Sequence, residues 1–254
     1  MPVILNEEEY AKRIIDTGEV GNKPTSTLFL LSRYFRQKME YGEKKTEKEL
    51  NQFMVNNYKN YIPAQWEDII EDIAKKGKKY KLQKIDYIGI TQKELDKISK
   101  VCNLKYEKLL FTMLCYAKLY NHLSETNNSW VNTDIRELYK IARVTVKYRN
   151  DKFLYLNDLE AAGLISFSNK NDNLNMKINF VDQFTDYVLK VDDFRELGYI
   201  YQQYTNNGSF TNCKECGRLI KKTNNKCLYC NDCKVLISAR QKRDWDLKNR
   251  ISEK

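Results

Sequence analysis

The chain contains a single histidine, His122, among its 254 residues. His122 follows a helical stripe of apolar residues, so we interpret it as a surface or helix-end residue rather than a catalytic base. The sequence also has no glycine-rich phosphate-binding loop, nucleophile motif or paired Cys/His arrangement. These absences argue against the common enzyme classes, and we expect a protein that is not an enzyme and has no catalytic residues. A metal-dependent nuclease built on scattered Asp and Glu residues is left open.

Glycine and proline are scarce as well, with 9 and 3 residues. Because these residues interrupt regular structure, their scarcity predicts many helices joined by polar loops. No apolar run approaches the roughly 18 residues that a membrane span needs, and the first residues lack the features of a signal peptide. We therefore expect no membrane association and a cytoplasmic location. The 42% of hydrophobic residues suffice for an ordinary core.

Positive charge is present in excess. The chain has 44 Lys and Arg against 34 Asp and Glu, a formal net charge of +10. From Cys213 onward there are 12 Lys and Arg against 5 Asp and Glu, so most of the excess lies in the last part of the chain. Nucleic acid is the commonest partner of such a basic surface.

Five of the seven cysteines lie between residues 213 and 233. Cys213 and Cys216 form a Cys-x-x-Cys pair, and the following Gly217 supplies the positive φ that such a turn often needs. A second pair follows after roughly ten to fifteen residues, the spacing at which two turns enclose a tetrahedral Zn²⁺. A cytoplasmic location keeps thiols reduced and favours metal over a disulfide. Because four thiolates fill the coordination sphere, we expect a structural zinc ribbon.

The second pair can be chosen in two ways, since Cys227 with Cys230 and Cys230 with Cys233 have the same spacing. We favour Cys230 with Cys233 because a helical pattern begins immediately after Cys233. Asn231 would tolerate positive φ in the other register. The predicted ligands are therefore Cys213, Cys216, Cys230 and Cys233, with Cys227 as the spare cysteine.

The region 91–184 has a specific order of expected elements, namely helix, short strand, helix, turn, helix and two-stranded hairpin. They cover residues 106–117, 130–131, 135–142, 145–162, 164–167 and 174–180. This order is similar to that of the winged-helix family of DNA-binding domains, and residues 158–165 look like the exit from its recognition helix into the wing. The resemblance implies that the helix over 145–162 lies in the major groove, with Lys170 at the hairpin tip near a phosphate or the minor groove.

Helical geometry gives a partial test of this resemblance. If Val146, Phe153 and Leu156 form the buried face, the opposite face turns toward solvent. The candidate nucleic-acid contacts on it are Lys147, Tyr148, Lys152 and Tyr155. Asp151 shares this face and would repel phosphates unless it accepts a hydrogen bond from a cytosine amino group. Many winged helices bind proteins instead, and that alternative stays open.

The rest of the chain is expected to be mainly helical. Residues 1–90 form a helical N-terminal region, and residues 185–211 a connector. Residues 212–254 hold the zinc ribbon and a basic helix over 235–251, whose Arg240, Lys242 and Arg243 are further candidates for phosphate contact. A solvated basic tail would have the same composition.

The whole arrangement resembles uncharacterised proteins of phages and mobile elements of Gram-positive bacteria. The resemblance favours replication or transcription control, and we expect a non-enzymatic protein that binds duplex DNA. The alternative is an adaptor or inhibitor that engages a host replication, transcription or defence factor. A structural dimer formed through the N-terminal helices is a third possibility.

Overall fold

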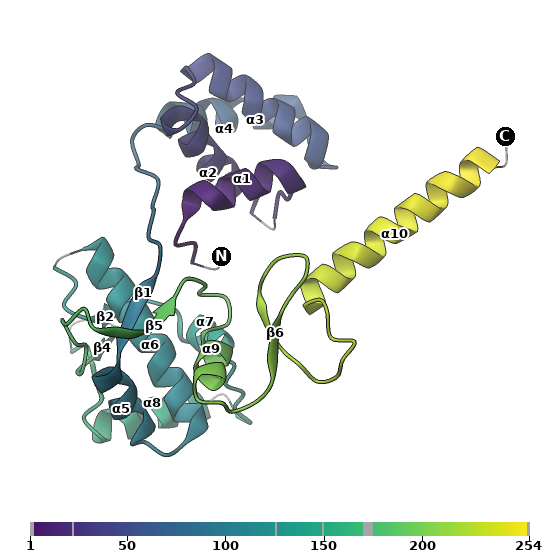
Figure 1. Ribbon diagram of the computed structural model, residues 1–254. Helices are drawn as coiled ribbons and strands as arrows, with labels where there is room; N and C mark the ends of the chain where they lie inside the picture. The colour runs from purple at the N-terminus through teal and green to yellow at the C-terminus, as the bar shows by residue number, and fades with distance from the viewer. Residues whose placement is uncertain (1–2, 22, 125, 149, 170–174, 253–254) are drawn as a thin grey trace. The chain divides into compact units, whose positions relative to one another are not determined.

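The computed structural model describes residues 3–21, 23–124, 126–148, 150–169 and 175–252. Within them the protein is mainly helical, with three small antiparallel sheets (Figure 1). The chain divides into two compact units, Val3–Asp86 and the part that begins at Tyr87. The N-terminal unit thus ends slightly before the boundary at residue 90 that the sequence suggested, because the residues after Tyr87 form a strand of the second unit.

The N-terminal unit is built from four amphipathic helices. They are α1 (Glu7–Thr17), α2 (Pro24–Gln37), α3 (Glu43–Asn57) and α4 (Pro63–Lys76). Leu28 and Leu31 on α2 are fully buried and pack with Leu50, Met54 and Ile70 from the neighbouring helices. Helix α2 therefore carries the centre of this core.

An ion pair closes the N-terminal unit around its last segment. Arg33 on α2 binds both carboxylate oxygens of Glu7, at 2.5 and 2.7 Å, and one of these oxygens also accepts the backbone N–H of Gln83 at 2.7 Å. The chain that leaves α4 is thereby fastened back onto α1 and α2.

The second unit is arranged around α6 (Leu104–Leu123), most of which is buried. After it come β2 (Trp130–Val131), α7 (Ile135–Ile141), α8 (Asp151–Ala161), β3 (Ile165–Phe167) and β4 (Met176–Ile178). This is the order of elements that the sequence predicted. The three strands form one antiparallel sheet in the order β2-β4-β3, so the first strand pairs with the last.

Helix α8 begins later than predicted, at Asp151 rather than at residue 145. Arg143 has a φ of +52°, which ends α7, and the Asp151 carboxylate accepts the backbone N–H of Tyr148, which fixes the first turn of α8. The predicted buried face is also wrong in part. Leu156 is buried as expected, together with Leu159, but Phe153 is 43% exposed.

The segment predicted to be a connector is an integral part of the second unit. Strand β5 (Tyr187–Val191) pairs with β1 (Ile88–Thr91), and α9 (Leu197–Tyr204) packs on α6. Phe194 and Tyr201 are almost completely buried, with their rings against Tyr116 and Phe111 of α6. The sequence did not reveal this packing because Tyr and Phe occur throughout the chain at exposed positions as well.

A buried carboxylate joins α5 (Gln92–Ser99) to α6. Glu94 accepts the backbone N–H of Thr91 and the Thr91 hydroxyl accepts that of Glu94, which makes the reciprocal N-terminal cap expected from their spacing. Lys118 of α6 binds the same carboxylate at 2.9 Å. The cap thus also anchors β1 and α5 to the central helix.

The last part of the chain forms the hairpin of β6 (Phe210–Asn212) and β7 (Leu219–Lys221), followed by α10 (Asn231–Ser252). Among the described residues, no helix combines the length and the apolar character needed to cross a membrane.

Gly198 allows a close approach of α9 to the end of α7. A Cβ atom at this position would lie 1.9 Å from the carbonyl oxygen of Ala142, which is a backbone atom and cannot turn aside. Helix α9, and the ribbon that follows it, can take their place only if this residue lacks a side chain.

We predict that Gly198→Ala lowers the free energy of unfolding by about 2 to 3 kcal/mol, the upper part of the range for overpacked interiors. Chemical denaturation monitored by circular dichroism measures this change. Gly42→Ala is the control, because a Cβ atom there would meet nothing within 4 Å. A loss of less than about 1 kcal/mol for Gly198→Ala would contradict the close approach.

Candidate metal centre

The first cysteine pair lies in the turn of the β6–β7 hairpin. The backbone N–H of Cys213 donates to the carbonyl of Arg218 at 2.8 Å, and that of Gly217 donates to the carbonyl of Cys213 at 2.9 Å. Gly217 has a φ of +70°, as its place after the pair predicted. This tight turn directs the sulfurs of Cys213 and Cys216 to the same side.

The second pair lies at the start of α10. Cys230 immediately precedes the helix and Cys233 is in its first turn, where the backbone N–H of Lys234 donates to the carbonyl of Cys230 at 3.0 Å. The backbone N–H of Lys214 donates to the carbonyl of Leu228 at 3.0 Å and holds the two turns together.

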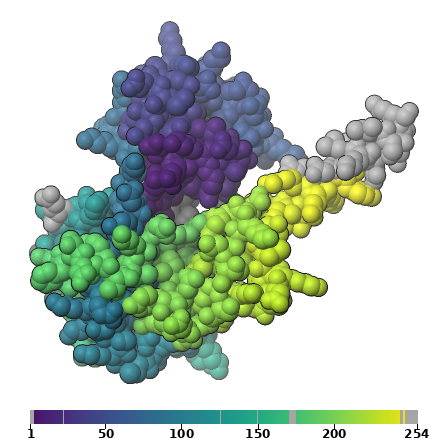
Figure 2. Space-filling view, viewed as in Figure 1, coloured from purple at the N-terminus to yellow at the C-terminus, as the bar shows by residue number. Residues whose placement is uncertain are grey.

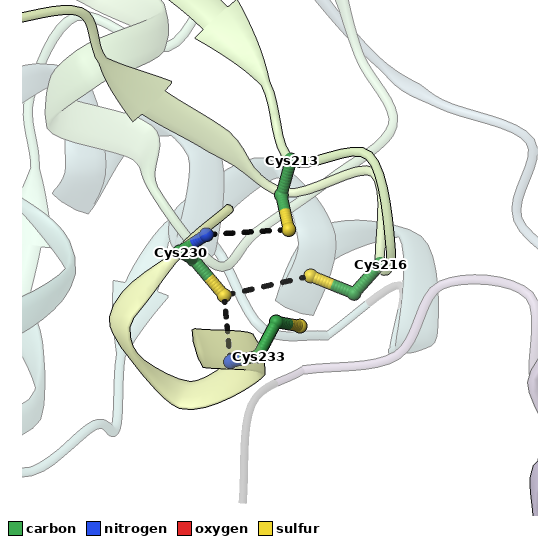
Figure 3. Close-up of side chains that lie close together, drawn as sticks. All are labelled: Cys213, Cys216, Cys230 and Cys233. Atoms are coloured by element: carbon green, nitrogen blue, oxygen red, sulfur yellow. Dashed lines mark hydrogen bonds between the residues drawn. The ribbon is translucent and has the colours of Figure 1, made fainter. Parts of the chain in front are cut away.

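The four sulfur atoms converge on one point (Figure 3). The Sγ atoms of Cys213, Cys216, Cys230 and Cys233 all lie within 4.8 Å of one another. Those of Cys216 and Cys230 are 3.8 Å apart, much farther than the roughly 2.05 Å of a disulfide bond. All four are free thiols, three of them buried, and together they could hold one metal ion.

Backbone donors prepare one of these sulfurs for a cation. Burial alone would raise the pKa of the Cys213 thiol, but N–H groups of Cys230, Cys216 and Glu215 directed at its sulfur lower the pKa to about 6. Burial raises the pKa of Cys216 and that of Cys233. A metal ion is the kind of group that brings all four sulfurs to the thiolate state.

Cys227 lies outside this cluster. Its sulfur is 3.7 Å from the carbonyl oxygen of Lys221 and 4.0 Å from the hydroxyl of Thr223. The structure thus brings together the four cysteines that the sequence favoured and leaves the fifth one aside.

The cluster is attached to the rest of the second unit by three charged residues that sequence reasoning missed. Arg195 donates to the carbonyl oxygen of Cys216 at 3.1 Å. Glu196, only 2% exposed, is bound in bidentate fashion by Arg143 and lies 3.9 Å from Arg218, which also pairs with Asp232 at 2.7 Å. In the sequence they are ordinary charged residues, and only the fold shows that they meet.

The candidate nucleic-acid residues near α8 differ in their surroundings. Lys147 and Tyr148 are exposed but precede the helix, while Lys152 is half-buried with its ammonium group 5.4 Å from the centre of the Tyr139 ring. Tyr155 does not point outward as predicted. Its ring packs edge-on against Tyr106 of α6 at 4.8 Å, because the later helix start rotates this side toward α6. Lys170 lies outside the described residues.

The candidates on α10 lie along a helix whose described side chains are almost all open to solvent (Figure 2). Lys242 is exposed, and Arg240 forms an ion pair with Glu215 at 3.2 Å. The side chain of Arg243 lies outside the described part of the chain.

The outer face of α8 is apolar rather than basic. Phe153 and Leu154 are 43% and 56% exposed, and Tyr148 just before the helix is 61% exposed. Asp158 and Glu160 are exposed as well, so the helix does not present an excess of cations.

Comparison with protein-family models, with curated proteins and with solved structures finds no match to this chain.

We predict that Cys213→Ser, Cys216→Ser, Cys230→Ser and Cys233→Ser each abolish stoichiometric metal binding, because each removes one of the four converging sulfurs. Cys227→Ser is the matched control and should keep one bound metal ion per chain. Elemental analysis of the purified variants by mass spectrometry measures the metal content. Metal retained at full stoichiometry by Cys230→Ser, or lost from Cys227→Ser, would show that the ligand set is wrong.

Proposed function

We propose that this chain is a non-enzymatic, DNA-binding protein whose ribbon and helix α10 hold the phosphate backbone of a duplex. The observation that carries the proposal is a group of exposed lysines on the ribbon and α10 that form no ion pair within the described residues. They are Lys214, Lys221, Lys222, Lys226, Lys234 and Lys242. Unpaired cations gathered in one small module repel one another, and a polyanion relieves that repulsion.

The metal in this proposal is a structural Zn²⁺. Thiolates are the ligands of most structural zinc sites, and a tetrahedron with metal–sulfur distances of about 2.3 Å separates its sulfurs by about 3.8 Å. The distance between Cys216 and Cys230 has this value. Four thiolates leave no open position for a substrate, which supports a structural rather than a catalytic role.

The middle of the second unit serves in this proposal as a winged helix. The order α6, β2, α7, α8, β3, β4 and the strand arrangement β2-β4-β3 support the assignment. In such a domain α8 approaches the major groove while phosphate contacts set the register. The resemblance to proteins of phages and mobile elements makes replication or transcription control in the cytoplasm the process that we propose.

We predict that Lys234→Gln combined with Lys242→Gln weakens duplex binding and lowers the slope of log affinity against log salt concentration by up to about 2, since each lost phosphate contact removes nearly one unit. Fluorescence anisotropy of the zinc-loaded protein with a labelled duplex at several salt concentrations measures the slope.

The control for this experiment is Lys97→Gln combined with Lys100→Gln, which removes the same charge from exposed positions of α5 or its end. This variant should bind like the wild type. Failure of the wild-type protein to bind duplex DNA even at low salt would overturn the proposed function.

The exposed apolar group of Tyr148, Phe153 and Leu154 favours a second candidate function, an adaptor that binds a protein through α8. Large apolar side chains are common at the centres of protein interfaces and of little use on a phosphate backbone. A purified candidate host factor should then form a complex that persists at a salt concentration that removes DNA. Phe153→Ser with Leu154→Ser should abolish that complex and leave the salt slope for DNA unchanged.

A further inference from the structure

Lys108 on α6 is a buried cation without a carboxylate partner among the described residues. Its side chain belongs to a residue that is 8% exposed, and its Nζ donates to the backbone carbonyl of Arg143 at 2.7 Å. A neutral carbonyl satisfies one hydrogen bond and leaves the positive charge uncompensated. Burial of an unpaired charge is costly, so proteins usually provide a counter-ion.

The charges closest to Lys108 increase this cost. Burial lowers the pKa of its ammonium group, and repulsion from Lys221, Lys105 and Arg143 lowers it further. These cations come from different elements: Lys105 and Lys108 from α6, Arg143 from the end of α7, and Lys221 from β7 of the ribbon. We call Lys105, Lys108 and Lys221 the junction lysines, because they meet where the ribbon adjoins α6.

The acidic groups on the surrounding elements are engaged elsewhere. Glu196 holds Arg143 and Arg218, which removes Arg143 from the set of available cations as well. Glu107 accepts a hydrogen bond from the Tyr201 hydroxyl at 3.0 Å, and Asp158 accepts one from Tyr106 at 2.5 Å. The junction lysines therefore have no ion-pair partner within the described residues.

We propose that the junction lysines form a binding site for a backbone phosphate of duplex DNA. This inference rests on the proposed function and names a place for the backbone that the ribbon and α10 alone do not define. Lys105 and Lys221 are exposed and contact the phosphate, whereas buried Lys108 adds positive potential from behind. The Tyr155 hydroxyl lies 3.4 Å from the Nζ of Lys105 and is a further donor beside it.

This site has a geometric consequence for recognition. Lys105 belongs to the helix on which α8 packs, and Lys221 belongs to the metal-bearing hairpin. One phosphate held between them fixes the ribbon and α8 in a common register on the duplex.

The test uses the zinc-loaded full chain with Lys105→Gln and Lys221→Gln combined. Both residues are exposed, so folding and zinc content should stay at wild-type values, which circular dichroism and elemental analysis verify. We expect affinity for a short duplex at 0.1 M salt to fall about 10- to 100-fold and the salt slope to decrease by about 2. The double variant Lys97→Gln, Lys100→Gln should show neither change.

The outcomes separate this inference from the proposed function. If the Lys105/Lys221 variant keeps the wild-type slope while the Lys234/Lys242 variant loses part of it, the protein binds DNA and the junction site is wrong. If the wild-type protein binds no duplex at low salt, both proposals fail. A decrease for the Lys105/Lys221 variant that exceeds that of the Lys97/Lys100 control supports the junction site.

Discussion

The buried carboxylate of Glu196 holds the ribbon to the rest of the second unit. Arg143 compensates its charge from the end of α7 and Arg218 from the ribbon, so the acid joins two parts of the chain that share little apolar surface. A charge in this position requires its partners, since removing one leaves the other uncompensated. The adjacent Arg195 reaches the backbone of Cys216 and extends the same attachment to the metal centre. The position of the four sulfurs relative to α6, α7 and α9 thus depends on one carboxylate and the guanidinium groups around it.

The ribbon has too little apolar material to fold on packing alone. Its core consists of three buried cysteines and Ile220, with Cys216, Cys227 and Tyr229 packed at the edge. Modules of this size usually need a metal ion or disulfides for stability. Four thiolates around Zn²⁺ carry a net charge of −2, which also reduces the mutual repulsion of the surrounding lysines. In the proposed protein the metal therefore stabilises the fold and makes a dense group of cations tolerable.

The sequence was most informative where the structure is local. The Cys-x-x-Cys spacing, the positive φ of Gly217 and the reciprocal cap of Thr91 and Glu94 each involve residues a few positions apart, and all three are present. The start of α8 and the packing of Tyr155 were predicted wrongly, because both depend on where the turn after Arg143 leaves the helix against α6. The partners of Glu196 and the burial of Lys108 join segments far apart in the chain, and no spacing in the sequence signals them.

The contact of Gly198 with the carbonyl of Ala142 sets a condition on how this protein can diverge. Any side chain at residue 198 would push α9 away from the end of α7 and carry the attached ribbon with it. The residue touches no metal and needs no unusual φ, so neither catalysis nor backbone conformation would preserve it. Among homologous chains, a glycine at this position would mark those that keep the ribbon on the same face, and a larger residue would mark those in which the two modules have separated.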